Sequence, residues 1–179
     1  NFFKDSNLLY VQSGAILSNI KKLAFNNGRL FPLSLASEGS CQIGGNLATN
    51  AGGLNVIKYG NVRDLCLGLE AVLPCGQIVS TMKPLKKNNM GFDLKNLLIG
   101  SEGTLGIITS TILKTFPIPK DPISIFLSIN NLANVLFVFE KISREFSERI
   151  LAFELIKMTG IDFIEETGFT IKNPFNKKT

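Results

Sequence analysis

The sequence predicts an α+β protein, with a mixed sheet and flanking helices before residue 117. Strand-like apolar runs alternate with runs of helical periodicity, which is the pattern of this class. Hydrophobic residues make up 45% of the 179 residues and charged residues 18%, a composition that provides a sizeable core and excludes intrinsic disorder. Three prolines between residues 117 and 122 predict a boundary within the chain.

The first elements follow from apolar patterning. Leu8–Gln12 is short, apolar and bounded by Ser-Asn and Ser-Gly, which predicts a strand. Residues 15–25 place apolar side chains on one helical face and are followed by Asn-Asn-Gly at 26–28, so we expect a helix with a C-cap. The runs 66–73 and 77–81 surround Pro-Cys-Gly and predict a β-hairpin.

Glycine is dense between residues 31 and 60, and regular patterning resumes after the hairpin. Residues 92–99 predict a short helix that Asp93 caps and Gly100 ends. The β-branched run 107–116 predicts a long strand.

The pattern restarts beyond the prolines. Residues 123–129 and 151–156 are expected to be strands, and 159–166 a short helix. An amphipathic helix between the two strands is predicted from the spacing of Leu132, Val135, Leu136, Phe139 and Ile142. Two strands are too few to bury both faces of a sheet, so this region is interpreted as a domain cut short.

These observations divide the chain into a folded region 1–116, a proline-rich linker 117–122, a truncated second domain 123–172 and a tail 173–179. Asn1 rather than methionine stands first, and we therefore expect a fragment. The longest apolar run, 135–139, is far shorter than the roughly 18 residues of a membrane span, so no transmembrane segment is expected.

Composition excludes several kinds of chemistry. The sequence has no histidine, which excludes Ser-His and Cys-His nucleophiles and histidine-rich metal sites. Three cysteines without CxxC spacing suggest neither a disulfide framework nor a zinc site, and no metal is expected. The net charge of +5 comes from scattered residues without an aromatic stripe or basic helix, so nucleic acid is not an expected partner.

Residues 37–53 carry the strongest chemical signal. Glycines at this density let the backbone approach a ligand, and successive N–H groups can form a nest for an anion. The hydroxyls of Ser40 and Thr49 and the amides of Asn46 and Asn50 add directional donors and acceptors. The alternative is an ordinary glycine-rich surface loop, but the interspersed apolar residues need burial and favour a ligand-lining segment.

Residues 99–109 form the second such segment. They lack the lysine of a P-loop and the spacing of a nucleophile elbow, and no GxGxxG occurs in the chain. A tight turn before a strand is the alternative interpretation. Together with the first segment, this turn favours a site built from two loops.

Three stretches resemble a known family. They are FPLSLASEGSCQIGGNLATNAGG (31–53), YGNVRDLCLGLEAVLPCGQIV (59–79) and GFDLKNLLIGSEGTLGIIT (91–109). They are similar to the second half of the FAD-binding (PCMH-type) domain of the vanillyl-alcohol oxidase/p-cresol methylhydroxylase superfamily. The similarity is to its branch of D-2-hydroxyglutarate dehydrogenase, D-lactate dehydrogenase and the glycolate oxidase flavin subunit.

The resemblance implies non-covalent FAD, since a histidine link is excluded. It implies that residues 37–40 and the glycines at 44–45 approach the pyrophosphate and ribityl chain. Residues 49–51 would lie by the isoalloxazine or its linker, and residues 102–108 would contact the adenosine and ribityl side. The implied cofactor-binding residues are Ser37, Glu38, Gly39, Ser40, Cys41, Gly44, Gly45, Thr49, Asn50, Ala51, Gly52, Glu102, Gly103, Gly106, Ile107 and Ile108.

The implied function is an FAD-dependent oxidoreductase of the D-2-hydroxyacid dehydrogenase type, which moves hydride from a 2-hydroxy acid to FAD. Region 1–116 would be the C-terminal part of the FAD-binding domain, and 123–172 the start of a ferredoxin-like α+β cap. The family's first pyrophosphate loop and catalytic histidines have no counterpart here, so no catalytic residue is assigned. The chain is expected to be inactive alone and a weak FAD binder.

The alternative function is a non-enzymatic remnant or interaction module. Incomplete sheet edges would then be covered by a complementary chain or a homo-oligomer. The family and the unpaired cysteines suggest a cytoplasmic location.

Overall fold

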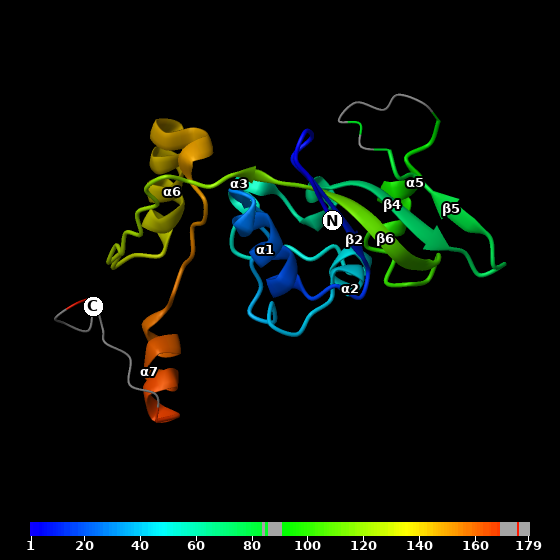
Figure 1. The fold of residues 1–179 in the computed structure, drawn as a ribbon. Coiled ribbons are helices and arrows are strands. Elements are labelled where there is room, and N and C mark those ends of the chain that lie inside the picture. The colour runs from blue at the N-terminus through cyan, green and yellow to red at the C-terminus, as the bar shows by residue number, and fades with distance from the viewer. Residues whose placement is uncertain (84, 86–90, 169–174, 176–179) are drawn as a thin grey trace. The chain divides into compact units, whose positions relative to one another are not determined.

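The computed structural model describes residues 1–83, 85, 91–168 and 175. The chain forms two compact units, Asn1–Pro119 and Lys120–Thr179, which are described separately (Figure 1).

A five-stranded sheet is the centre of the first unit. Its strand order is β1-β2-β6-β4-β5, and every pair between these strands is antiparallel. The strands are β1 (Phe2–Phe3), β2 (Leu8–Gln12), β6 (Ile107–Lys114), β4 (Cys66–Val72) and β5 (Ile78–Ser80). The mixed sheet expected from the sequence is therefore antiparallel throughout its described pairs, because β6 enters between β2 and β4 and runs opposite to both. A second, two-stranded sheet pairs β3 (Arg29–Leu30) with β7 (Phe116–Pro117).

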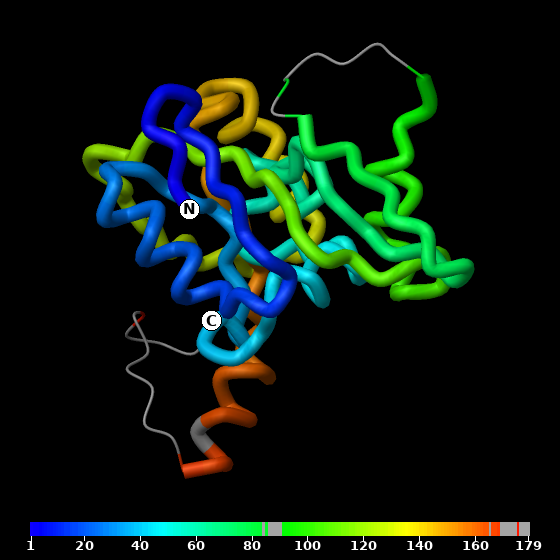
Figure 2. Tube along the Cα trace, turned by 45° about the vertical axis from the view of Figure 1, so that its right-hand side comes forward, coloured from blue at the N-terminus to red at the C-terminus, as the bar shows by residue number. Residues whose placement is uncertain are grey.

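Helices α1 (Leu17–Asn26) and α2 (Ile43–Ala48) lie on the same side of the large sheet in both views (Figures 1 and 2). Three short helices complete the unit: α3 (Val56–Tyr59), α4 (Val62–Leu65) and α5 (Leu94–Leu98). The core consists of apolar side chains from these helices, the sheet and the loop before α2. Its fully buried members include Leu9, Leu17, Phe31, Ile43, Leu47, Leu69 and Leu113.

The sequence predictions for the first unit are largely confirmed. The α+β class, the strand Leu8–Gln12, the first helix, the hairpin and the long strand all occur. The helix after the hairpin is also confirmed, and Asp93 caps it by accepting a hydrogen bond from the Asn96 N–H. Helices α2, α3 and α4 were not predicted, because their glycines and short lengths hide the helical period.

The second unit has helices and no described strand. It contains α6 (Ala133–Phe146), the 3-10 turn η1 (Ser147–Arg149) and α7 (Met158–Glu166), so both predicted helices are confirmed. The strands predicted at 123–129 and 151–156 are wrong for the described residues. Apolar, β-branched sequence forms a strand only when another backbone pairs with it. The ferredoxin-like cap therefore remains a prediction, and the predicted tail falls, apart from residue 175, outside the described residues.

Within the part of the chain that the structure describes, no helix combines the length and apolar character needed to cross a bilayer.

Candidate flavin-binding site

Helix α2 places the first glycine-rich segment against the sheet. Ile43 and Leu47 are fully buried in the core and anchor the helix. Its first N–H groups bond to the turn that follows β2: Ile43 N–H donates to the Ala15 carbonyl (3.0 Å), and Gly44 N–H to the Ser13 carbonyl (2.9 Å). The 13–15 turn thus belongs to the site region, although sequence reasoning did not include it.

The adjacent glycines Gly44 and Gly45 have different roles. A Cβ on Gly44 would lie 2.5 Å from the Cβ of Ser13, so only glycine permits this close approach. A Cβ on Gly45 would meet no atom within 4 Å, and Gly45 is exposed. Since the Gly44 N–H is already bonded within the fold, Gly45 is the glycine of this pair that offers open space to a ligand.

The two glycine-rich segments meet at the C-terminal end of α2. Gly100 N–H donates to the Leu47 carbonyl (3.0 Å), and Glu102 N–H donates to the Ala48 carbonyl (2.9 Å). These bonds satisfy carbonyls that the end of a helix leaves without partners. Asn50 (φ 49°) and Glu102 (φ 51°), one on each segment, hold left-handed backbone conformations that cost energy for residues other than glycine. The fold therefore brings segments 37–53 and 99–109 together and holds them in specific conformations.

Arg63 on α4 joins the same two segments. Its guanidinium donates to the carbonyls of Asn96 and Ile99, at the end of α5, and its backbone N–H donates to Asn50 Oδ1 (3.2 Å). Sequence reasoning missed this residue. The available signal was that Arg63 lies inside the resembling stretch 59–79, to which sequence reasoning assigned no site residue.

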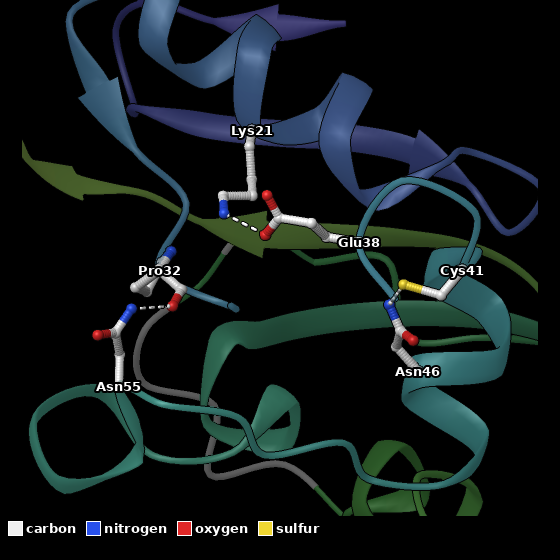
Figure 3. A network of polar contacts seen from close by, with 6 residues as sticks. All are labelled: Lys21, Pro32, Glu38, Cys41, Asn46 and Asn55. Atoms are coloured by element: carbon white, nitrogen blue, oxygen red, sulfur yellow. Dashed lines mark hydrogen bonds and ion pairs between the residues drawn. The ribbon is translucent and has the colours of Figure 1, made fainter. Parts of the chain in front are cut away.

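Some side chains of segment 37–53 already interact with other residues of the fold (Figure 3). Glu38 forms an ion pair with Lys21 of α1, and Asn46 Nδ2 lies 3.5 Å from Cys41 Sγ. Just outside the segment, Asn55 Nδ2 donates to the Pro32 carbonyl (2.8 Å) and holds the loop before it. Glu38 and Cys41, both implied cofactor residues, thus already have structural partners.

Two hydroxyls of the segment also bond within it. Thr49 Oγ1 donates to the Gly45 carbonyl (3.0 Å), and Ser40 Oγ donates to the Ser37 carbonyl (3.3 Å). A hydroxyl that donates internally still has lone pairs, so both can accept hydrogen bonds from a ligand.

The remaining implied residues differ in accessibility. Ser37, Gly39, Thr49, Glu102 and Ile107 are exposed, whereas Ala51, Gly52 and Gly103 are half-buried. Gly106 and Ile108 are buried: a Cβ on Gly106 would lie 2.8 Å from the Val72 carbonyl oxygen, and Ile108 belongs to the core. Ile107 is 65% exposed and Ile108 only 7%, so only the first of these two isoleucines can contact a ring.

The donor set fits the dinucleotide that the resemblance implies. A Cβ added at Gly39 or at Gly45 would meet no atom within 4 Å, so the backbone at both positions is open to a ligand. Ser13 Oγ, beside Gly44, is buried without a hydrogen-bond partner. The two segments also carry the hydroxyls of Ser40 and Thr49 and the exposed apolar Ile107, while the Glu38 carboxylate forms an ion pair with Lys21. Neutral polar groups and an apolar side chain suit a ribityl-diphosphate and an aromatic ring.

Comparisons with known proteins identify flavoproteins and 2-hydroxy acid dehydrogenases as similar to this chain. The FAD binding domain family model matches residues 2–82. A D-2-hydroxyglutarate–pyruvate transhydrogenase of Saccharomyces cerevisiae is 37% identical over 168 residues, which cover 92% of this chain and 34% of that protein. The mitochondrial D-2-hydroxyglutarate dehydrogenase of Bos taurus is 42% identical over 156 residues, which cover 87% of this chain and 29% of that protein.

A solved structure is also similar. An alkyldihydroxyacetonephosphate synthase matches with a TM-score of 0.59 and 27% identity, over 68% of this chain and 21% of that one. The chain thus spans 29 to 34% of the length of the two curated relatives named above.

Proposed function

Because this chain belongs to the FAD-binding (PCMH-type) family, in its D-2-hydroxyacid dehydrogenase branch, we propose that it supplies one wall of the flavin site of such an oxidoreductase. FAD is the cofactor of this family. The observation that carries the proposal is the meeting of segments 37–53 and 99–109 at the end of α2. The substrate of the complete enzyme would be a D-2-hydroxy acid, as the names of the relatives suggest.

In this proposal, bound FAD supplies the hydride acceptor and the chain binds and orients it. Ser37, Gly39, Ser40 and Gly45 hold the diphosphate and ribityl chain, because Gly39 and Gly45 leave space for them. Thr49 and Asn50 lie near the ring, where the Thr49 oxygen can accept a hydrogen bond. Glu102, Gly103 and the exposed Ile107 contact the adenosine and ribityl side.

The proposed roles of other implied residues are indirect. Gly44, Gly106 and Ile108 support the site by close packing, and Glu38 and Cys41 hold the loop that leads into α2. Arg63 positions both segments through the Asn50 side chain and the end of α5.

An FAD titration of the purified chain tests the proposal, with flavin fluorescence and melting temperature followed together. Gly45→Val adds a side chain to the open space at this position without a clash, so we expect FAD affinity to fall by at least about tenfold. The matched control is Gly160→Val, which changes a glycine in α7 that also has no atom within 4 Å of a Cβ. This control should bind FAD as the natural chain does.

Either of two results would contradict the proposal. Equal affinity of Gly45→Val and the natural chain would show that FAD does not approach the backbone at Gly45. Absence of quenching and of any thermal shift with the folded natural chain would favour the second candidate function.

That second function is an interaction module that needs a complementary chain or a second copy. It is favoured by the exposed apolar side chains of the second unit, where Val135 is the one buried hydrophobic residue among those described. Reconstitution of FAD-dependent oxidation on addition of a chain that carries the rest of a relative would instead support the flavin proposal.

A cytoplasmic location is proposed from the family and the free cysteines. Relatives from Bos taurus and Rattus norvegicus carry the word mitochondrial in their names, which describes those proteins. Imaging of the tagged natural gene product decides between the two compartments.

A further inference from the structure

Asn50 stands at a backbone position where glycine is the usual residue. It follows Thr49, the C-cap of α2, and its φ of 49° is left-handed. Its N–H donates to the Leu47 carbonyl (3.1 Å), and the Ala51 N–H donates to the Asn46 carbonyl (2.8 Å). This pair of bonds is the Schellman motif, whose left-handed residue is most often glycine. Asparagine therefore carries a backbone cost here that glycine would not.

The Asn50 side chain has a fixed orientation. Its Oδ1 accepts a hydrogen bond from the backbone N–H of Arg63 (3.2 Å), in the first turn of α4, where N–H groups have no partner within the helix. An N–H can pair with the oxygen of a side-chain amide but not with its nitrogen. The contact with Arg63 therefore determines which end of the amide is Oδ1, and it leaves the Nδ2 end for another partner.

The Nδ2 end offers two N–H donors to a ligand. Within the part of the chain that the structure describes, Asn50 bonds only through its backbone and Oδ1. Among the described residues that are buried or half-buried, Ser13 Oγ is the one side-chain polar atom that is enclosed and has no partner, so the Nδ2 of the half-buried Asn50 reaches the surface. A ligand can accept its hydrogen bond without breaking a bond within the fold.

Arg63 holds the second segment beside this amide. Its guanidinium donates to the carbonyls of Asn96 and Ile99, and Gly100 follows directly. A Cβ on Gly100 would lie 3.0 Å from Arg63 Nη2 and 3.4 Å from the Asn50 Cβ. The guanidinium, the glycine and the asparagine are thus closely packed, and the φ of +83° at Gly100 also favours glycine.

Hydrogen bonds join these residues into a closed ring. The Leu47 carbonyl accepts both from the Asn50 N–H (3.1 Å) and from the Gly100 N–H (3.0 Å). Gly100 follows Ile99, whose carbonyl accepts from the Arg63 guanidinium. The Arg63 N–H then returns to Asn50 Oδ1. Because each member of the ring restrains the others, the amide is held in place before a ligand binds, which lowers the entropy cost of binding.

We propose that Asn50 donates a hydrogen bond from Nδ2 to the isoalloxazine ring of FAD, and that Arg63 is the positioning residue that holds it. The inference rests on the proposed function and adds the group that meets the ring. The oxidised ring carries carbonyl oxygens and unprotonated nitrogens, which accept hydrogen bonds. The neighbouring Thr49 hydroxyl donates to the Gly45 carbonyl (3.0 Å) and offers the ring only lone pairs, so the donor is Asn50.

Asn50→Asp tests the donor with little change in shape. Aspartate also tolerates the left-handed conformation and keeps an oxygen for the Arg63 N–H, but it has no Nδ2. In an FAD titration of the full chain, the dissociation constant should rise at least about tenfold. The visible absorption spectrum of the FAD that still binds should differ from that on the natural chain, because the ring has lost a hydrogen bond.

The matched control is Asn7→Asp. Asn7 is likewise half-buried and left-handed, with φ 55°, but it precedes β2, whereas α2 bonds to the turn after β2. This variant introduces the same charge and should bind FAD with the affinity and spectrum of the natural chain. Asn50→Gly is a second test variant, which removes the donor in a conformation that glycine adopts without strain, and it should also lose FAD affinity.

Arg63→Met tests the positioning role in the absence of FAD. Amide hydrogen exchange measured by NMR should become faster at Gly100 and Glu102, whose N–H groups bond to the end of α2. With FAD, the dissociation constant should rise and the bound spectrum should shift in the same direction as in Asn50→Asp. Arg63→Lys keeps the charge and can still donate to a carbonyl, so its exchange rates and affinity should lie between those of the natural chain and Arg63→Met.

Three results would overturn the role of Asn50 while leaving the proposed function intact. They are a natural dissociation constant in Asn50→Asp, equal losses of affinity in Asn50→Asp and Asn7→Asp, and an unchanged spectrum of the FAD bound to Asn50→Asp, which would place the amide on the diphosphate. Natural exchange rates in Arg63→Met would overturn the role of Arg63. Failure of the proposed function has a different signature, since the natural chain would then bind no FAD, and this would overturn the assignment of Asn50 as well.

Discussion

The two units of this chain are both rich in apolar residues, yet only the first buries them. In Asn1–Pro119, side chains from the sheet, α1, α2 and the connecting loops form one contiguous core. In Lys120–Thr179, Val135 is the one described hydrophobic residue that is buried, while Ile123, Leu136 and Phe163 are more than half exposed. The difference shows that apolar content becomes a core only when strands find neighbours and present a common face.

The largest expected effect is on stability, and it should differ between the two units. Leu69, on β4, is completely buried, and Leu69→Ala should lower the free energy of unfolding by about 2–5 kcal/mol, through lost burial and the cavity left behind. Leu136→Ala, at a side chain 75% exposed, should change it by less than about 0.5 kcal/mol. Urea unfolding followed by circular dichroism measures both. Similar losses in the two variants would contradict the contrast between the units.

Replacing one glycine in each unit by alanine compares how the backbone of the two units tolerates a side chain. Gly53 has φ +95°, and a Cβ there would lie 2.1 Å from the Ser34 carbonyl oxygen. Gly53→Ala should therefore cost about 1–3 kcal/mol of stability in the same unfolding measurement. Gly160 lies within α7 with open space around it, so Gly160→Ala should instead increase the helical signal, since alanine favours a helix by about 1 kcal/mol over glycine. An unchanged stability of Gly53→Ala would show that the connection between α2 and α3 can adopt another backbone conformation.

The smallest expected change in stability depends on pH and comes from the Cys66 thiol of the first unit. Burial raises the pKa of the Cys66 thiol above its ordinary value of 9.0, and its hydrogen bonds with Thr111 and Gly68 only partly oppose this. Above pH 9.0 the unfolded chain releases the thiol proton while the folded chain keeps it, so the stability that this group contributes decreases as pH rises through that range.

Unfolding measured from pH 8 to 10 should therefore show a decline in stability that Cys66→Ala reduces. Burial also raises the pKa of Tyr59 above 10.0, and this second decline should begin at higher pH and persist in the variant. An identical pH profile for both proteins would rule out Cys66 as a cause. The exposed Cys75 provides a control, since Cys75→Ala should leave the profile unchanged.

Much of the first unit could be predicted from sequence because its signals are local. The alternation in Leu8–Gln12, the Pro-Cys-Gly turn of the hairpin and the Asp93 cap each depend on a few neighbouring residues. The unpredicted helices α2 to α4 occur where glycines and short lengths remove the period on which such predictions depend. In the second unit, the same reasoning predicted strands at 123–129 and 151–156, because strand propensity can be read from one segment whereas strand pairing needs two.

In the candidate site too, some features could be predicted from the sequence and others could not. The sequence indicated both glycine-rich segments, and the family resemblance indicated their ligand. The sequence could not show that the two adjacent glycines differ, with Gly44 packed against Ser13 and Gly45 facing open space. The sequence also could not show that Glu38 is paired with Lys21, or that Ile108 is buried beside the exposed Ile107. These distinctions depend on residues far apart in the chain.

By itself, the sequence determined the α+β class, most elements of the first unit and the two glycine-rich segments that we propose as the cofactor site, since propensity, turn chemistry and glycine spacing act over a few residues. Only the tertiary structure decided the strand order, the junction of the two segments at the end of α2, and the part of Arg63 in holding them. The physical reason is that a hydrogen bond or a buried contact between distant segments depends on the path of the whole chain, which no local pattern records.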